Sequence, residues 1–408
     1  MKYEAVITGL GPVAPNGVGK EAFWEAIKSG KSGIRTITKF DASAYPCRIA
    51  GEIPGELLTD EFKKLPDWLP ASMSCKFSVL ATILALEDAG LEPDDIGKRD
   101  SAVLMGVSTT DMEVVQREYT SFVENGSPRP DSLISAFPHT PAVVVSHYIK
   151  SFANVVTIST ACTSGLNSID YAAKMIMRGE SDLVIAGGVD TPLSPLVLSG
   201  FCSAGMVPTD YNHLPAKASR PFDDKRQGGV LSEGAGVVIL EEKTLALKRN
   251  ARIYASYAGG GFATSISPAW MKRSMITAMK GALTTADLRQ GMVDYINACA
   301  PGDPVIDQVE TEAIKDLFGP EAYNIPVSSL KSMIGNPGAA AGPLQVIASV
   351  LTMKNRFISP TVNLEKPSLD CDLDYVPEKG RVARVDRIMI NLRGFGGGIT
   401  SMLIKNYR

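Results

Sequence analysis

Short apolar runs alternate with longer segments of helical periodicity along the whole chain. The runs are nearly all apolar, which is typical of strands buried on both faces. They lie at Tyr3–Thr8, Ala102–Val107, Val155–Ser159, Leu183–Ala186, Val237–Leu240, Ile253–Tyr257, Tyr295–Ala298, Val327–Leu330, Ile388–Leu392 and Ser401–Ile404. Amphipathic segments predict helices at Lys76–Ala89, Gly165–Met177 and Arg273–Thr284. Strands that alternate with helices favour an α/β fold with a largely parallel sheet covered on both faces.

Two similar α/β halves packed into one body are the expected organisation, because 408 residues exceed one ordinary domain. A weak break at Glu241–Asn250, a charged run between two predicted strands, separates residues 1–250 from residues 251–408. No internal repeat is strong enough to prove duplication. The segment Met112–Pro141, rich in proline, serine and charge, is expected to be an excursion between core elements.

Composition and charge narrow the class of protein. Hydrophobic residues make up 45% and charged residues 21% of the chain, and the net charge is −3. This balance gives no reason to expect nucleic acid or an anionic membrane as a partner. No apolar stretch approaches the ~20 residues of a membrane span, and no signal peptide is visible. The six cysteines are scattered without metal-type spacing, so we expect reduced thiols in a cytoplasmic protein.

A candidate nucleophile stands where a predicted strand turns into a predicted helix. In TISTACTSGLNSIDYAAK, the β-branched run ends at Ser159 and helical spacing begins directly after Cys162. The positive end of a helix favours thiolate over thiol and would activate the sulfur. A buried structural thiol is the usual fate of a free cysteine. The strand–TACTSG–helix setting favours the nucleophile here.

A glycine-rich loop near the C-terminus is a second candidate feature. In NLRGFGGGITSM, four glycines surround Phe395 between two apolar runs. One backbone N–H of such a loop can donate to an oxyanion, with the N–H of Cys162 as the other donor. A plain turn between two strands fits the loop equally well when it is considered alone.

Several of these segments together resemble the elongating β-ketoacyl-acyl-carrier-protein synthases. They are TACTSG, RPFDDKRQGGVLSEGAGVVILEE and GFGGG, together with VITGLGPVAPNG, FDASAY and AGGVDTPLSP, and they span nearly the whole chain. The resemblance implies a five-layered αβαβα thiolase-like fold and a homodimer. It also implies decarboxylative condensation of a malonyl-carrier with an acyl chain bound to the cysteine. The substrate would arrive on the phosphopantetheine arm of an acyl carrier protein, so no metal and no bound cofactor are expected.

Both histidines that this family combines with its cysteine are replaced. INACAPGDPV resembles the family's NAHGTxT, with Cys299 at the histidine position and Glu310 at the expected spacing. KSMIGNPGAAAG resembles KSxxGHxxGAAG, with Lys331 matched and Asn336 in place of the histidine. The chain's three histidines fall outside both motifs and are expected in the core or in loops: His139, His147 and His213.

These replacements should change the chemistry. The Asn336 amide can donate a hydrogen bond but cannot take up a proton near neutral pH, and the Cys299 thiol is a weak donor and a poor base. A single oxyanion donor is worth ~3–4 kcal/mol of transition-state stabilisation, so losing both imidazoles should slow decarboxylation severely. We therefore expect acyl transfer onto Cys162 to be retained and condensation to be absent or altered. Lys331 and Glu310 are either electrostatic support for the site or structural ion-pair partners.

Three functions remain open from the sequence. The chain is a condensing enzyme that uses Cys162, Cys299 and Asn336, or an acyltransferase or thioesterase, or a non-catalytic partner of an active ketosynthase. The retained Cys162 argues against the third, because such partner subunits usually lack the cysteine. A Cys162–Cys299 disulfide switch is a further option. A heterodimer with an active synthase is the alternative to the homodimer.

The resemblance also suggests residues around the acyl chain. Phe395 matches a gate at the mouth of the acyl pocket, and Thr110 lies in the region that limits chain length. Arg393 replaces an aromatic residue, which argues against a simple saturated chain as substrate. The residues expected to contact substrate are Thr110, Thr163, Phe201, Arg393, Gly394 and Gly396. Basic residues are expected to dock the acidic carrier: Lys217, Lys225 and Arg226.

Overall fold

The computed structural model describes residues 3–109, 111–129, 132–151, 154–265 and 267–407. Thr110, a predicted substrate contact, lies outside these residues. The described chain forms one large sheet and two small ones. The large sheet contains β1 (Ala5–Ala14), β2 (Gly17–Val18), β5 (Ser101–Val107), β6 (Asn154–Ile158), β7 (Leu183–Asp190), β8 (Gly234–Glu242), β9 (Ala255–Thr264), β10 (Tyr295–Asn297), β11 (Val327–Ser328), β14 (Arg387–Arg393) and β15 (Gly398–Asn406). The small sheets pair β3 (Arg35–Thr36) with β4 (Ile49–Ala50) and β12 (Phe357–Ile358) with β13 (Arg381–Val382).

The large sheet is mixed. Its order is β11-β10-β14-β15-β9-β1-β8-β7-β5-β6. Parallel pairs join β5 to β6 and β7, and β10 to β11 and β14. The pairs β1–β8, β1–β9, β7–β8, β9–β15 and β14–β15 are antiparallel. The prediction of a largely parallel sheet is wrong. The alternation of strands with helices does not decide which strands become neighbours, and β1 pairs antiparallel with β8 and β9. An apolar run reports burial on both faces and carries no information on strand direction.

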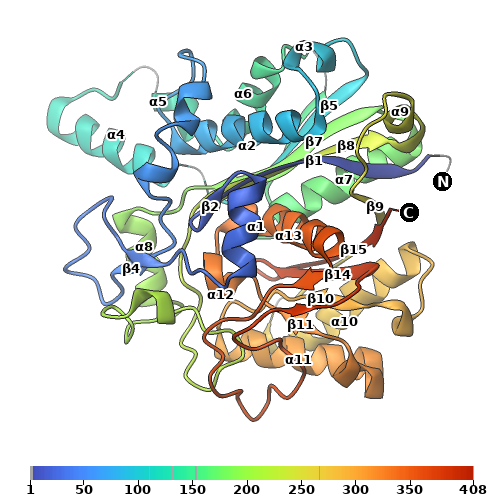
Figure 1. Cartoon of the computed structure of the whole chain (residues 1–408). Helices are drawn as coiled ribbons and strands as arrows, with labels where there is room; N and C mark the ends of the chain where they lie inside the picture. Colours follow the sequence, from blue (N-terminus) through green and yellow to red (C-terminus); the bar gives the residue numbers. More distant parts are fainter. Residues whose placement is uncertain (1–2, 110, 130–131, 152–153, 266, 408) are drawn as a thin grey trace.

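Helices and sheet alternate in five layers (Figure 1). The helix α2 (Met73–Ala89) covers the outer face of the N-terminal strands, whereas α7 (Ser164–Arg178) and α13 (Ala341–Asn355) lie between the two halves of the sheet. The helices α10 (Pro268–Thr285) and α11 (Pro304–Phe318) form the opposite outer layer. Every residue from 341 to 353 is buried, as expected for a helix enclosed by both sheet halves. The αβαβα arrangement expected from the sequence is confirmed.

The two halves of the sheet follow the order of the chain. Strands before residue 250 form one half, strands after it form the other, and they join where β1 meets β9 at Val6–Ser256 and Ile7–Ala255. The segment predicted as an excursion forms α4 (Met112–Asn125), which packs on α5 and α8 at one side of the molecule (Figure 1). The remaining helices are α1 (Lys20–Lys28), α3 (Pro93–Ile96), α5 (Ser132–Ala136), α6 (Thr140–Tyr148), α8 (Pro195–Ser203), α9 (Lys243–Lys248) and α12 (Lys331–Ile334).

Several strand ends differ from the predicted ones, and two of these differences have identifiable reasons. The strand β9 continues to Thr264, because its glycine run gives α10 room to pack against it. A Cβ on Gly261 would lie 2.0 Å from the carbonyl oxygen of Ala278. The strand β11 ends at Ser328, because Leu330 already caps α12.

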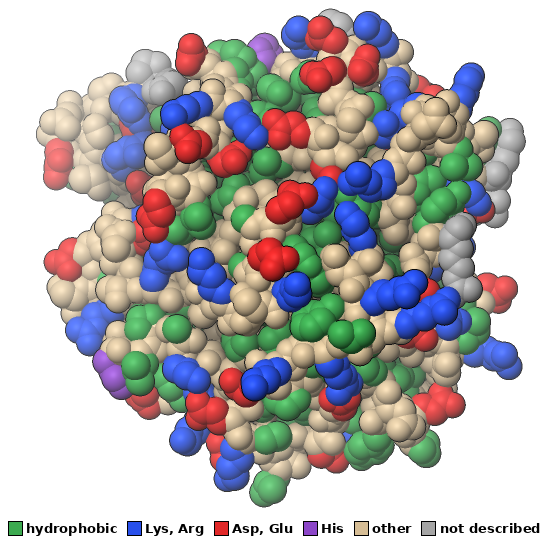
Figure 2. Space-filling model, in the orientation of Figure 1, with side chains coloured by type: hydrophobic (Ala, Val, Ile, Leu, Met, Phe, Trp, Pro, Cys, Tyr) green, Lys and Arg blue, Asp and Glu red, His purple; other side chains and the backbone are tan. Residues whose placement is uncertain are grey.

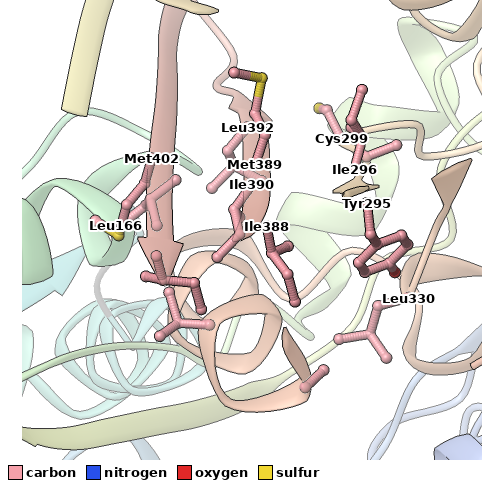
Figure 3. Packing of buried hydrophobic residues seen from close by; sticks show 14 of the residues in the cluster. Leu166, Tyr295, Ile296, Cys299, Leu330, Ile388, Met389, Ile390, Leu392 and Met402 are labelled. Carbon is pink, nitrogen blue, oxygen red and sulfur yellow. The ribbon is translucent and has the colours of Figure 1, made fainter. Parts of the chain in front are cut away.

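Hydrophobic residues gather in the interior and charges of both signs lie on the surface, as the composition predicts. Figure 3 shows Cys299 beside Ile296, just past the end of β10, within the largest cluster of buried hydrophobic residues. On the face seen in Figure 2, acidic and basic side chains are interspersed. Among the described residues, no helix combines the length and the apolar character needed to cross a membrane.

Candidate active site

Cys162 lies on the turn between β6 and α7, as the sequence predicts. The preceding residue, Ala161, has φ 57, an uncommon backbone conformation for a residue with a side chain. The hydroxyl of Ser164 holds this turn, since it donates to the carbonyl oxygen of Ala161 at 2.5 Å and accepts from the N–H of Thr160 at 2.8 Å. The turn therefore holds Cys162 in a fixed position at the start of α7.

A cavity of 470 Å³ opens at Cys162. Most of its surface is apolar, which suits an acyl chain better than a polar ligand. Phe201 and Phe395 both line it, with ring centroids 6.3 Å apart, and Phe395 is 65% exposed. Other lining residues come from the ends of β5 and β7, from the start of α4, from α8 and the segment after it, and from the loops before β8 and α13: Ser108, Thr109, Met112, Asp190, Val197, Met206, Leu231, Asn336 and Gly338.

The glycine-rich loop lies directly against the nucleophile. Gly394 joins β14 to β15, and its N–H donates to the carbonyl oxygen of Gly398 at 2.8 Å. A Cβ on Gly394 would lie 3.1 Å from the Cβ of Ala161 and 3.2 Å from the nitrogen of Cys162. Because glycine allows this approach, the backbone of Phe395 comes near the sulfur of Cys162, where its N–H acts to lower the pKa of that thiol. The backbone of the loop thus meets the reacting atom, as expected for an oxyanion donor.

The environment of Cys162 favours the thiol. Burial raises the pKa of the Cys162 thiol above its usual value, and the charge of Asp190 adds to this effect. The backbone hydrogen bond from Phe395 and the positive charge of Lys331 work in the opposite direction without outweighing burial. This result differs from the sequence-based expectation of a thiolate favoured by the helix end.

Cys299 and Lys331 are in contact beneath the cavity. The Nζ of Lys331 lies 2.5 Å from the carbonyl oxygen of Cys299 and 3.7 Å from its sulfur. Both side chains are 2% exposed. Burial raises the pKa of the Cys299 thiol to about 11, although the charge of Lys331 opposes the rise. Cys299 is therefore a protonated thiol at neutral pH.

Glu310 holds the segment that carries Cys299. Its carboxylate accepts from the N–H of Cys299 at 3.0 Å and from the N–H of Ala300 at 2.8 Å. The side-chain amide of Asn391 donates to it at 3.2 Å. Burial raises the pKa of Glu310, and the two backbone donors oppose this. These contacts favour the support role predicted for Glu310.

Asn336 and Arg393 complete the constellation. A second cavity, of 60 Å³, is lined by both residues together with Cys162, Cys299 and Lys331. The backbone N–H of Asn336 donates to the carbonyl oxygen of Val230 at 2.8 Å, whereas its buried Oδ1 has no hydrogen-bond partner. The backbone N–H of Arg393 donates to the sulfur of Cys299 at 3.2 Å. The structure thus brings the predicted catalytic residues into one site, where Cys162 and Cys299 are free thiols.

Other predicted residues lie elsewhere. Thr163 is 1% exposed and its hydroxyl donates to the carbonyl oxygen of Thr160 at 2.6 Å, outside the lining of both cavities. Gly396 is exposed in the loop and also outside these linings. The three histidines are exposed, which contradicts the core alternative for them: His139, His147 and His213.

Arg226 is a wrong candidate for carrier docking. Its side chain is buried and donates to the backbone carbonyl oxygens of Asp223 and Pro304, both at 2.9 Å. A guanidinium occupied in this way offers no charge to a partner. Lys225 is exposed. Lys217 pairs with Glu365 at 3.2 Å, and both side chains of this pair are partly exposed. Carrier docking by these two lysines stays a prediction.

Asp190 is a site residue that the sequence reasoning missed. Its buried carboxylate accepts from the N–H groups of Ser108 and Thr109, both at 2.9 Å, and from the N–H of Ala339. Burial raises the pKa of Asp190 to about 6. The carboxylate thereby joins three segments of the cavity wall. The signal was an acidic residue ending a buried strand in AGGVD.

Gln345 of α13 was missed as well. Its amide nitrogen donates to the side-chain oxygen of Asn297 at 3.0 Å and to the carbonyl oxygen of Ala298 at 2.9 Å. These bonds fix the segment before Cys299 from the central helix layer. The sequence offered only a lone polar residue within an apolar helix.

Comparisons with known proteins identify the family of this chain. The models "Beta-ketoacyl synthase, N-terminal domain" and "Beta-ketoacyl synthase, C-terminal domain" match residues 3–246 and 251–365. The 3-oxoacyl-[acyl-carrier-protein] synthase 2 of Coxiella burnetii is 37% identical over 406 residues, 97% of each chain. The tetracenomycin polyketide synthase ketoacyl synthase alpha subunit of Streptomyces glaucescens is 37% identical over 410 residues, 96% of this chain and 94% of the relative.

Solved structures give the same result. The ishigamide ketosynthase/chain length factor matches with a TM-score of 0.91 at 27% identity, over 100% of both chains. A β-ketoacyl synthase from Burkholderia phymatum matches with a TM-score of 0.89 at 31% identity, again over 100% of both chains. The solved complex of a type II polyketide acyl-carrier protein with its ketosynthase contains a chain that matches with a TM-score of 0.91 at 28% identity, over 100% of both chains. This chain belongs to the β-ketoacyl synthase family.

Proposed function

We propose that this member of the family transfers an acyl group from a carrier thioester to Cys162, and that its condensation step is absent or altered. The sulfur of Cys162 attacks the thioester carbonyl, and the carrier thiol leaves with the proton that Cys162 gives up. The observation that carries the proposal is the lining of the 60 Å³ cavity. It joins Cys162 to Cys299 and Asn336, and no described histidine reaches it.

Acyl transfer needs a nucleophile, an oxyanion site and an acyl pocket. The backbone N–H groups of Cys162 and Phe395 are the proposed oxyanion donors, supported by the close approach of Gly394 to Cys162. The 470 Å³ cavity between Phe201 and Phe395 is the proposed acyl pocket. Transfer between two thioesters breaks and forms the same kind of bond, so it requires no external driving force.

Condensation needs groups that this site lacks among its described residues. An enolate oxygen must be stabilised as carbon dioxide leaves. The resemblance of the segments around Cys299 and Asn336 to the family's two histidine motifs supports a site without those imidazoles. Cys299, with its pKa of about 11, neither gains nor releases a proton readily at neutral pH. Asn336 can donate but cannot transfer a proton. These properties support an altered or absent carbon–carbon bond-forming step.

The partners are part of the proposal. An acyl carrier protein is the proposed donor, supported by the related ketosynthase that was solved in complex with its acyl-carrier protein. A homodimer is the proposed assembly, and a heterodimer with an active synthase is the alternative, in line with the ketosynthase/chain length factor relative. Free, scattered cysteines support a cytoplasmic location.

Intact-protein mass spectrometry after incubation with acyl-carrier thioesters of several chain lengths tests the transfer step. The wild type should gain one acyl mass, and Cys162→Ala should gain none. Loss of the adduct to water over time would identify a thioesterase. No adduct at any chain length would refute transfer and favour a non-catalytic partner subunit.

A further inference from the structure

The buried carboxylate of Asp190 joins the end of β5 to the turn at residues 336–340. Asp190 ends β7 and is fully shielded from solvent. One of its oxygens accepts from the N–H of Ser108 at 2.9 Å, and the other accepts from the hydroxyl of Ser108 and from the N–H of Ala339. Both segments line the 470 Å³ cavity. A single side chain thus fixes two parts of the cavity wall that are far apart in the sequence.

Two glycines let the turn at residues 336–340 fit between Asp190 and the helix α7. Gly338 has φ +53, and a Cβ on it would lie 2.0 Å from the Oδ2 of Asp190. A Cβ on Gly165, in the first turn of α7, would lie 2.2 Å from the carbonyl oxygen of Ala339. The position of this turn relative to the nucleophile therefore depends on its bond to Asp190 and on its close packing against α7.

The negative charge of Asp190 has no cationic partner. Its hydrogen-bond donors are N–H and hydroxyl groups of uncharged residues. Among the described residues, no lysine or arginine lies within ion-pair distance of the carboxylate. Burial raises the pKa of Asp190 to about 6, so the group is largely ionised at neutral pH. An uncompensated negative charge therefore lies in the wall of the cavity that opens at Cys162.

This charge acts on the nucleophile. The other charged or titratable residues around Cys162 line the 60 Å³ cavity: Cys299, Asp303, Lys331 and Arg393. The charge of Lys331 favours the thiolate of Cys162, whereas the charge of Asp190 disfavours it. Two negative charges in one low-dielectric wall repel each other. The carboxylate thus favours the thiol form of Cys162.

We propose that Asp190 is a positioning residue for the transfer step, which holds the turn carrying Asn336 against α7 and whose charge lowers the reactivity of Cys162. The proposal rests on the acyl transfer proposed above and assigns a further residue to it. A carboxylate accepts hydrogen bonds on both oxygens, whereas an amide presents an NH2 group on one side. An amide at this position would direct a donor at a backbone N–H. The carboxylate is therefore needed for the geometry of the wall, and a less reactive sulfur is the consequence.

The pH dependence of Cys162 alkylation by iodoacetamide, followed by peptide mapping, tests the effect of the charge. In Asp190→Asn the midpoint should fall by roughly 0.5–1 pH unit, so that alkylation at neutral pH becomes about threefold to tenfold faster. Asp190→Glu keeps the charge and displaces the carboxylate, so its midpoint should stay at the wild-type value. Asp170→Asn is the matched control, because Asp170 is equally buried, accepts from the hydroxyl of Tyr257 at 2.5 Å and lines neither cavity. Its midpoint should also stay unchanged.

The positioning role is measured with an acyl-carrier thioester. Adduct formation, followed by intact mass, should slow by at least about tenfold in both Asp190→Asn and Asp190→Glu, because a small displacement of the wall misplaces the thioester. Asp190→Asn should thus combine faster alkylation with slower transfer. If Asp190→Asn does not fold, Asp190→Ser carries the same test, because its hydroxyl is uncharged and can accept one N–H bond.

The outcomes separate this inference from the proposed function. An unchanged midpoint in Asp190→Asn would overturn the inference, as would wild-type transfer rates in both variants at this position. Equal midpoint shifts in Asp190→Asn and Asp190→Glu would assign the effect to a loosened wall and not to the charge, which also overturns it. No adduct on the wild type at any chain length, together with the shifted midpoint in Asp190→Asn alone, would refute the proposed function and leave the effect of Asp190 on Cys162 standing.

Discussion

The Nζ of Lys331 lies 2.5 Å from the carbonyl oxygen of Cys299 and 3.7 Å from the sulfur of the same residue. The shorter contact is to the backbone, and a buried lysine requires such a partner. Lys331 therefore holds the segment after β10 in position more strongly than it activates the sulfur. Cys299 remains a thiol with a raised pKa.

Removing the Lys331 amine should destabilise the protein. Lys331→Met leaves the buried carbonyl oxygen of Cys299 without this donor, which should lower the free energy of unfolding by about 1–3 kcal/mol. Urea denaturation followed by tryptophan fluorescence measures the change. Lys379→Met, at an exposed position, serves as the control. A loss below about 0.5 kcal/mol in Lys331→Met would show that the contact contributes little.

The two cavity thiols should react very differently in the folded protein. Iodoacetamide at neutral pH should modify Cys162, which is partly exposed, and spare Cys299, which is 2% exposed and has a pKa of about 11. Peptide mapping after brief labelling separates the two sites. Labelling of Cys299 as fast as Cys162 under native conditions would contradict this description of its environment.

The rate of acyl transfer should increase with pH through the neutral range. Burial raises the pKa of Cys162, so the thiolate is a minor species at neutral pH and its fraction grows about tenfold per pH unit. The first-order rate of adduct formation, measured by intact mass at a series of pH values, should follow this increase. A plateau already reached at mildly acidic pH would mean that the end of α7 lowers the pKa after all.

Gly394→Ala should impair transfer through a steric effect on Cys162. The new Cβ would lie 3.0 Å from the carbonyl oxygen of Thr160 and 3.2 Å from the nitrogen of Cys162, so the loop must move by a few tenths of an ångström. We expect adduct formation to slow by about tenfold, since oxyanion donors tolerate little displacement. Gly396→Ala, whose Cβ meets nothing within 4 Å, is the control for backbone strain, because its φ is +86. Equal effects of the two variants would argue against close approach as the cause.

Local patterns in the sequence predicted much of this fold and site. The position of Cys162 followed from a β-branched run, a turn of small residues and helical spacing, which are properties of neighbouring residues. Cys299 and Asn336 could be located because their motifs keep matching residues on both sides. Strand direction could not be predicted, because an apolar strand has the same pattern whichever way its neighbour runs.

Side-chain contacts between segments that lie far apart along the chain could not be predicted from the sequence. Arg226 looked available for docking, and its burial depends on the backbone of Pro304, far along the chain. Asp190 was missed because its donors come from residues 108–109 and 339, which meet only in the folded protein. Thr163 lies next to the nucleophile in sequence, yet its hydroxyl turns back to Thr160.

The central claim is that Cys162 accepts an acyl group while Cys299 and Asn336 cannot support normal condensation. The most direct measurement is a single turnover in which the acylated enzyme is mixed with malonyl-carrier and β-ketoacyl-carrier is quantified by mass spectrometry. The double variant Cys299→His/Asn336→His is run beside the wild type, with adduct formation measured on both. We predict a persistent adduct and no β-ketoacyl product from the wild type, with product formed only where the imidazoles are introduced. Rapid formation of β-ketoacyl-carrier by the wild type would contradict the account.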